Sequence, residues 1–363
     1  MMGVQARTAE VSDKLAVLRA ALQQAGAGAI RLRGMDWFAW VTGGGSSAVL
    51  HAAETGVAEV LVTQDEACVL TDEIEAERLR NEEVPPGFTF HIEPWAEPEL
   101  RARFVANAAG GRAVLSDRPA NGDQPLPLGL RQHRMVLGPA EQDRYRTLGR
   151  EAAEAMSEVL RRARPDWTEY ELAGAGADAL WRRGIHPALV LAAGERRLPL
   201  YRHPTPSHER IGRRAMLVFC ARRHGLYANL TRFVSFGAAP EAQRALMDVE
   251  ATGLASVVPG KSLSAVYHAL AQAYRHADRD EAIREHHQGG ITGYLAREIV
   301  ATASTATQLE PGMAFAFNPS FEGLKIEDTF LLGPDGLENL TFDPAWPALD
   351  VHGRKRPLWL EAQ

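Results

Sequence analysis

The sequence predicts two domains, an α/β N-terminal domain and a second domain built from longer helices and strands. Helix-like and strand-like segments alternate over the first 116 residues, which is typical of an α/β layer. Residues 120–130 then hold two prolines and two glycines, a composition that disfavours regular structure and suits an exposed connection. We therefore expect domains at 1–125 and 126–363.

Short apolar runs carry the alternation in the first domain. Leu15, Leu18 and Leu22 recur at helical spacing, and Gly26 is a typical helix stop. We expect strands at 29–32, 57–62, 67–70, 88–92 and 113–116, and further helices at 73–83 and 97–107. The triplet Gly43-Gly44-Gly45 has no basic partner, so no nucleotide site is expected.

The second domain opens with a long amphipathic helix over 141–162. The next helix begins at a capping box, in which the Thr168 hydroxyl and the Glu171 carboxylate satisfy free backbone amides. Further helices are expected at 241–257 and 262–276, and strands at 188–193, 216–221, 226–236, 313–317 and 324–332.

Composition excludes several classes of protein. A hydrophobic share of 45% with 24% charged residues is typical of a globular chain, and a net charge of −6 gives no reason to expect nucleic acid or an anionic membrane as partner. No run approaches the roughly 18 apolar residues of a membrane helix, and no signal-peptide pattern opens the chain. Cys68 and Cys220 lie in separate strand-like runs, which indicates reduced thiols and a cytoplasmic location.

Three stretches of the second domain share a pattern with one enzyme family. They are residues 217–232, which end in Asn-Leu-Thr-Arg, residues 286–291 with His-His-Gln-Gly-Gly-Ile, and residues 311–328, which run from Pro-Gly-Met through Asn-Pro to Lys-Ile-Glu-Asp. These stretches resemble the M24 peptidases, the family of methionine aminopeptidase, Xaa-Pro aminopeptidase and prolidase, with metal-free creatinase as a relative. The resemblance covers about 138–335. It implies an α+β pita-bread fold for 126–363 and a prolidase-like or creatinase-like N-terminal domain.

In that family the same stretches supply Asp, Asp, His, Glu and Glu to two metal ions. The resemblance places Val218, Asn229, Gly289, Asn318 and Glu327 at those positions. Valine and glycine offer no side-chain ligand, and the asparagines offer only neutral amide oxygens. One carboxylate cannot neutralise two dications, so we expect no metal centre and no cofactor.

The same resemblance singles out residues around the cleft. The segment that ends at His203 is similar to one that ends in a substrate-contacting histidine, which transfers protons in creatinase; a simple polar-loop histidine is the alternative. A second family histidine aligns with Arg297. Together with Thr231, His286 and His287, these residues are expected to line the cleft. The period of a strand also places Lys325 on the face of Glu327.

A relocated zinc site is a second interpretation of the histidines. Neighbours on a strand point to opposite faces, so His286 and His287 can bind one ion only if the chain bends after them. Such a site would use one of them with His203 and Glu327. Cys220 is better interpreted as a small buried side chain than as a nucleophile.

Three functions remain open on the sequence. The chain is a non-catalytic relative that binds a peptide or small amide, a metal-independent creatinase-like hydrolase of C–N bonds using His203 and Glu327, or an Xaa-Pro peptidase with a rebuilt metal site. Losing the metal ligands removes the activated water, which favours the first. Creatine is not expected as substrate, because Thr231 stands where creatinase has a substrate-binding Glu.

The resemblance also implies a homodimer, since prolidase-like and creatinase-like relatives pair through this architecture. Trp37, Phe38 and Trp40 precede the glycine triplet in a stretch expected to be a short loop. These rings suit an interface or a cleft lid, or they fill the core of the first domain.

Overall fold

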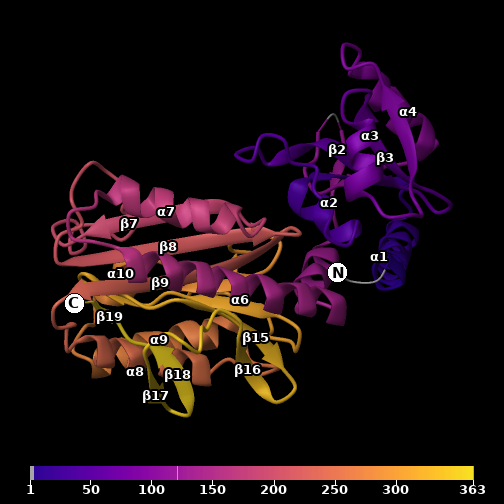
Figure 1. Cartoon of the computed structure of the whole chain (residues 1–363). Coiled ribbons are helices and arrows are strands. Elements are labelled where there is room, and N and C mark those ends of the chain that lie inside the picture. Colours follow the sequence, from indigo (N-terminus) through magenta and orange to yellow (C-terminus); the bar gives the residue numbers. More distant parts are fainter. Residues whose placement is uncertain (1–3, 121, 363) are drawn as a thin grey trace. The chain divides into compact units, whose positions relative to one another are not determined.

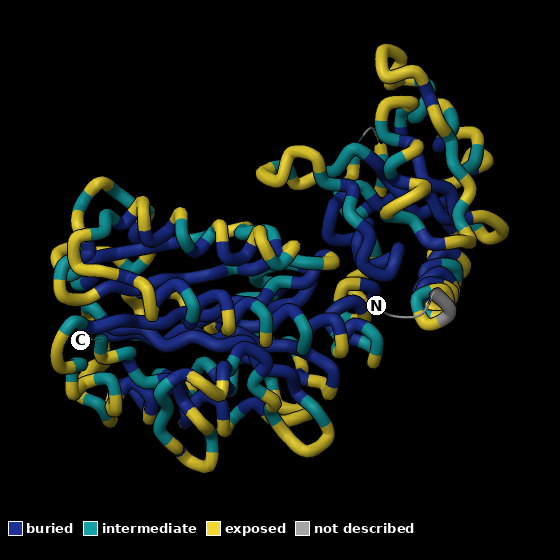
Figure 2. The backbone as a smooth tube through the Cα atoms, viewed as in Figure 1, coloured by how far each residue is buried: buried dark blue, intermediate teal, exposed yellow. Residues whose placement is uncertain are grey.

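The computed structural model describes residues 4–120 and 122–362. The chain forms two compact units, Met1–Glu141 and Gln142–Gln363 (Figure 1). The first unit is α/β and the second is α+β, as the sequence predicts. In Figure 2 the buried backbone of each unit follows its strands, where the core lies.

The first unit is built on a six-stranded mixed sheet in the order β4-β3-β2-β1-β5-β6. Its strands are β1 (Ala29–Gly34), β2 (Thr55–Val62), β3 (Ala67–Asp72), β4 (Thr89–Glu93), β5 (Val114–Ser116) and β6 (Gln124–Pro125). Strand β1 pairs antiparallel with β2 and parallel with β5. The expected connection at 120–130 is more ordered than its composition suggests, because β6 joins the sheet there and a helix begins at Leu128.

Apart from the helix that begins at Leu128, which was not expected, the helices of the first unit agree with the sequence prediction except at two places. They are α1 (Val4–Ala25), α2 (Met35–Val41), α3 (Ala76–Arg78), the π-helical turn η1 (Leu79–Glu83), α4 (Glu99–Ala109) and α5 (Leu128–Met135), and α6 (Pro139–Arg162) continues into the second unit. The helix expected over 73–83 is thus reduced to one turn and a π-helical segment.

The second difference is α2, which replaces the expected loop. Trp37, Phe38 and Trp40 are 5%, 0% and 2% exposed, so these rings fill the core of the first unit. Trp37 and Trp40 meet edge to face with their centroids 5.3 Å apart, a geometry that aromatic pairs favour. The interpretation of this segment as an interface or lid is therefore wrong.

The second unit contains two larger sheets, in the orders β19-β9-β8-β7 and β11-β10-β12-β15-β16, and the hairpins β13-β14 and β17-β18. The first sheet holds β7 (His186–Gly194), β8 (Arg214–Arg223), β9 (Leu226–Phe236) and β19 (Leu360–Ala362). The second holds β10 (Gly289–Thr292), β11 (Ile299–Val300), β12 (Ala314–Phe317), β15 (Asp328–Gly333) and β16 (Gly336–Asn339). The hairpins are β13 (Ser320–Phe321), β14 (Leu324–Lys325), β17 (Ala348–Val351) and β18 (Arg354–Pro357).

The helices of this unit lie on both sides of its strands in Figure 1. Helix α7 (Glu169–Trp181) packs against β7 and β8, and its N-terminus has the predicted capping box of Thr168 and Glu171. Helix α8 (Gln243–Ala255) packs against α9 (Leu263–His276) and the two hairpins, and α10 (Ala282–Glu285) follows.

The strand expected over 324–332 is broken, and the residues between its two parts connect the two sheets. Strand β14 ends at Lys325 and β15 begins at Asp328. Between them, Glu327 forms an isolated antiparallel bridge with Thr231 of β9, whose backbone N–H donates to the Glu327 carbonyl at 3.1 Å. This bridge holds the Glu327 side chain beside the middle of β9.

Candidate functional site

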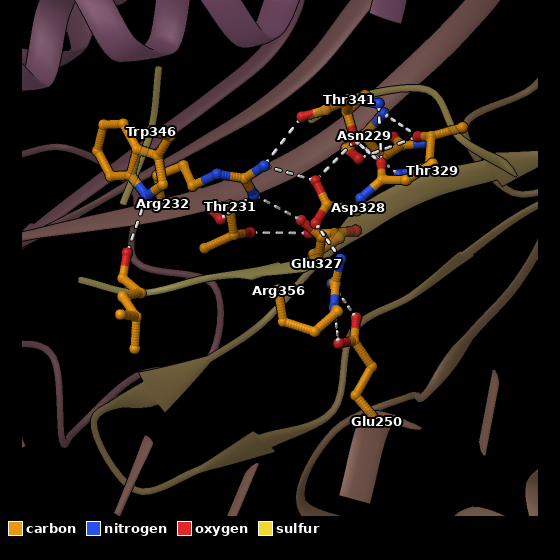
Figure 3. A network of polar contacts seen from close by, with 12 residues as sticks. Asn229, Thr231, Arg232, Glu250, Glu327, Asp328, Thr329, Thr341, Trp346 and Arg356 are labelled. Carbon is orange, nitrogen blue, oxygen red and sulfur yellow. Dashed lines mark hydrogen bonds and ion pairs between the residues drawn. The ribbon is translucent and has the colours of Figure 1, made fainter. Parts of the chain in front are cut away.

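Glu327 is the centre of a buried cluster of charged and polar side chains. It is 2% exposed. One carboxylate oxygen accepts a hydrogen bond from Arg297 Nη2 at 2.6 Å, and the other accepts from Lys325 Nζ and from Thr231 Oγ1, each at 2.9 Å. Figure 3 shows the contact with Thr231. The carboxylate therefore has two cationic partners and one hydroxyl partner.

The two cations decide the charge state of Glu327. Burial alone raises the pKa of a carboxyl group, because it disfavours the charged form. Lys325 and Arg297 outweigh burial and lower the pKa of Glu327 to about 2. Glu327 is therefore an ionised, weakly basic carboxylate at neutral pH.

The sequence predicted one of the two cations. Lys325 contacts Glu327, as the sequence predicted, although the strand expected to carry both residues is broken between them. Arg297 was expected only as a cleft residue, because nothing in the local sequence shows that residue 297 reaches residue 327. Arg232, a neighbour of Thr231, ion-pairs with Asp328 instead.

The other expected metal positions lie around this cluster without adding charge. Val218 on β8 pairs with Thr231 and is 2% exposed. Asn229 is fully buried, and its Nδ2 donates to Thr292 Oγ1 at 3.0 Å. The Oδ1 atoms of Asn229 and Asn318 are buried and have no hydrogen-bond partner among the described residues.

Two neighbouring glycines occupy the strand that the family motif assigns to the metal-binding histidine. Gly289 and Gly290 pair with Phe317 and Ala316 of β12. Since strand side chains alternate, Gly290 lies on the face of Thr292, which contacts Asn229, and Gly289 lies on the other face. Neither residue has a side chain that binds a metal. A Cβ atom at Gly289 would lie 2.0 Å from the Ala316 carbonyl oxygen, so this backbone leaves no room for one.

The structure brings the three predicted cleft histidines together. His203 lies in the loop after β7, and His286 and His287 lie between α10 and β10. The Nε2 atoms of His203 and His286 are 2.9 Å apart. His203 makes no hydrogen bond or ion pair with Glu327 in the described part of the chain.

These imidazoles are neutral at physiological pH. Burial, followed by the charge of Lys325, lowers the pKa of His286 to about 3. Burial and the charge of Arg297 lower the pKa of His287 to about 4. Burial and Lys325 also lower the pKa of His203. Neutral imidazoles next to two cations accept protons poorly but keep lone pairs for other ligands.

Cys220 is adjacent to the cluster and remains a thiol. It pairs in register with Asn229 across β8 and β9. Burial, followed by the charge of Glu327, raises the pKa of its thiol to about 11. A thiol with such a pKa is a poor nucleophile at neutral pH.

A second network anchors the strand that carries the cluster (Figure 3). Asp328 Oδ1 accepts hydrogen bonds from Arg232 and from Thr341 Oγ1, both at 2.7 Å. Its other oxygen ion-pairs with Arg356 at 2.8 Å, and Arg356 binds Glu250 of α8 through two hydrogen bonds of 2.6 Å. Arg356, Glu250 and Asp328 are buried. This network fixes β15 and therefore the position of Glu327.

Comparison of the fold finds prolidase-like structures. The Xaa-Pro dipeptidase from Bacillus anthracis is 19% identical, with 92% of this chain and 98% of that chain covered and a TM-score of 0.77. The prolidase from Pyrococcus horikoshii OT3 is 16% identical, with 91% and 98% covered and a TM-score of 0.77. The N-terminal domain of FACT complex subunit SPT16 from Cicer arietinum (chickpea) is 15% identical, with 93% and 96% covered and a TM-score of 0.66. The match extends over both units and confirms the pita-bread architecture.

Comparison of the sequence gives a family. No curated protein matches the chain. Within the described residues, no helix combines the length and the apolar character that crossing a membrane requires. The profile of metallopeptidase family M24 matches residues 143–334, more than half of the 363-residue chain. With the three motifs and the fold, this match places the chain in metallopeptidase family M24.

Proposed function

We propose that this M24 member has no dinuclear metal centre, does not hydrolyse Xaa-Pro dipeptides, and binds a small peptide or amide in its cleft. The observation that carries the proposal is the surrounding of Glu327. Its carboxylate is bound by Lys325 and Arg297, so two side-chain cations already neutralise the negative charge that metal ions would need.

Charge balance supports the loss of the metal centre. Two dications bring four positive charges, which carboxylates must largely neutralise in a buried site. Here Glu327 contributes one negative charge, and Lys325 and Arg297 contribute two positive charges. Asn229 and Asn318 are neutral, so the cluster already has a net positive charge that would repel metal ions.

A metal-independent hydrolase is the second candidate, and Glu327 argues against it. A general base works best with a pKa near the working pH. With a pKa of about 2 and three partners, Glu327 takes up a proton poorly and has little capacity to bind a cationic substrate group. His203 alone would have to supply the acid–base chemistry.

A narrow pocket beside the cluster is where we place the ligand. In this structure its volume is only about 10 Å³, so a dipeptide enters only if the side chains around it move apart. Its walls combine apolar and polar groups, as ligand sites commonly do: Leu198, Tyr201, Arg202, Met216, His286, Ser320, Phe321, Gly323, Leu324 and Lys325. Tyr201 is 48% exposed and reachable from solvent.

Calorimetric titration with glycyl-proline, its C-terminal amide and a panel of other dipeptides tests this proposal. We expect at least one compound to bind without being cleaved. Tyr201→Ala should weaken that binding, whereas Tyr170→Ala, at an exposed tyrosine outside the pocket, should not. Cleavage of glycyl-proline, or binding of no compound in the panel, would contradict the proposal.

The cytoplasm is the compartment we propose. Cys68 and Cys220 are both free thiols. Reduced cysteines are typical of that compartment.

A further inference from the structure

Three histidines form a compact set of nitrogen donors next to the Glu327 cluster. Each of His203, His286 and His287 offers one ring nitrogen, and these three atoms lie within 4.8 Å of one another. The ring centroids of His286 and His287 are 4.4 Å apart, and those of His203 and His287 are 5.6 Å apart. Two separate segments of the chain therefore converge on one point.

His286 and His287 can both approach His203 only if the chain bends near them, and the sequence alone did not decide whether it does. Neighbours on a regular strand face opposite sides, but His286 and His287 lie outside any strand, between α10 and β10, and their ring centroids are 4.4 Å apart. Gln288 Nε2 donates to the His286 carbonyl oxygen at 2.7 Å, which holds the backbone at the turn. Both imidazoles consequently face His203.

An unsatisfied buried atom points to a missing ligand. His286 is 8% exposed, and the one hydrogen bond of its side chain among the described residues joins its Nε2 to His203. Its Nδ1 is buried and has no partner in that part of the chain. Buried polar atoms are rarely left unpaired, and an ion is one explanation when they are.

We propose that His203, His286 and His287 bind one transition-metal dication, of the Zn²⁺ or Co²⁺ class, with a further position open to water or a ligand. Imidazole suits Zn²⁺ and Co²⁺, whereas Mg²⁺, Ca²⁺ and Mn²⁺ prefer oxygen ligands. Nitrogens about 2.0–2.1 Å from a tetrahedral ion stand about 3.4 Å from one another. The three donor nitrogens, which lie within 4.8 Å of one another, have to move closer by about 1 Å to reach this spacing.

The site shares no ligand with the Glu327 cluster. It therefore stands independently of the proposed function, and it differs from the family's dinuclear site in position, number of ions and ligand type. Lys325 and Arg297 already form ion pairs with the Glu327 carboxylate, so Glu327 is not free to bind a metal together with the three histidines.

Two features oppose the metal and limit its affinity. His287 Nδ1 accepts a hydrogen bond from the Gly289 N–H at 3.2 Å, and this bond is given up if the ring takes the tautomer that binds metal through Nε2. The positive charges of Lys325 and Arg297 also repel a dication. Lys325→Gln should therefore strengthen metal binding, on the order of tenfold.

Titration of chelator-treated protein with Co²⁺, followed by visible absorption and by competition with Zn²⁺, tests the site. We expect one equivalent per chain. His203→Ala and His287→Ala should each weaken binding on the order of tenfold or more. His208→Ala is the matched control, since His208 is an exposed histidine of the same loop, and it should leave binding unchanged.

The outcomes separate this inference from the proposed function. No binding, or binding that His203→Ala and His287→Ala leave intact, would overturn the histidine site and leave the proposed function untouched. Two equivalents, one of them lost in Glu327→Gln, would contradict the proposed function instead. Circular dichroism of each variant shows whether the fold is retained.

Discussion

Glu327 needs both of its cations. Removing either one leaves a fully buried carboxylate with a single cationic partner. We expect Arg297→Met and Lys325→Met each to lower the free energy of unfolding by about 2 kcal/mol, the cost of a charged hydrogen bond lost in a buried site. Urea denaturation measures this change. Arg284→Met, at the exposed pair with Glu281, should change stability by less than about 0.5 kcal/mol.

The histidines make stability depend on pH. His286 has its pKa lowered from 6.5 to about 3, and the pKa of His287 is lowered to about 4. Because the unfolded chain binds these protons more readily than the folded chain, stability is full above about pH 6.5 and falls as the pH drops toward these values. The stabilisation from the Glu327 carboxylate is full above about pH 4.5 and is lost only as the pH falls from there toward 2, because its pKa is lowered from 4.5 to about 2.

Unfolding free energies measured between pH 7.5 and 5 with chelator present isolate the histidine contribution. We expect a decrease toward pH 5 that is smaller in His286→Gln, because that variant no longer gains a proton on unfolding. An unchanged slope in His286→Gln would contradict the buried, neutral state of this imidazole.

The identities of the residues predicted part of the site, whereas the rest of it depends on contacts between residues that are far apart in the sequence. The five motif positions follow from the resemblance to the family, and the nearness of Lys325 to Glu327 follows from their separation by two residues. Arg297 reaches Glu327 across 30 residues, and His203 reaches His286 across 83. Such contacts depend on how strands of two sheets meet, and no local pattern encodes that geometry.

At the scale of elements, β15 is held in place by buried charges. Glu250 of α8 binds Arg356 through two hydrogen bonds, and Arg356 also binds Asp328 at the start of β15. Without the Glu250 charge, Arg356 keeps Asp328 as its carboxylate partner. We expect Glu250→Gln to destabilise the protein by about 2–3 kcal/mol, the cost of weakening charged hydrogen bonds in a buried site.

Thermal and urea unfolding of Glu250→Gln measures that cost. Asp248→Asn is the control on the same helix, because Asp248 is exposed and its side chain ion-pairs with the exposed His352. It should be close to neutral. Similar losses in both variants would indicate that the helix, rather than the buried pair, responds to the substitutions.

Elements with strong local signals were predicted well. The capping box at Thr168, the glycine stop after α1 and the apolar strands all have short-range causes. The break between β14 and β15 was missed, because Ile326 and Glu327 fit a continuous strand and only the bridge to Thr231 interrupts it. Helix α2 was missed because aromatic residues before glycines also suit a loop.

At the scale of the molecule, the fold could be predicted because several motifs occur in the same order as in the family. The order of the strands could not, since β19 joins β9 from the far end of the chain. The aromatic segment at residues 37–40, once a candidate interface, is buried in the first unit and supplies no support for a dimer.

We still expect a homodimer, on the ground of the family resemblance alone. Light scattering at micromolar concentration should give twice the mass of the 363-residue chain. A mass of one chain under these conditions would rule out a stable dimer.

The metal content of the protein tests the central claim most directly. Protein incubated with excess Mn²⁺, desalted and analysed for bound metal should retain far less than two equivalents per chain, since oxygen-preferring Mn²⁺ finds one ion-paired carboxylate, Glu327. The same sample should leave glycyl-proline intact. Two retained equivalents of Mn²⁺, together with chelator-sensitive hydrolysis of the dipeptide, would contradict the account.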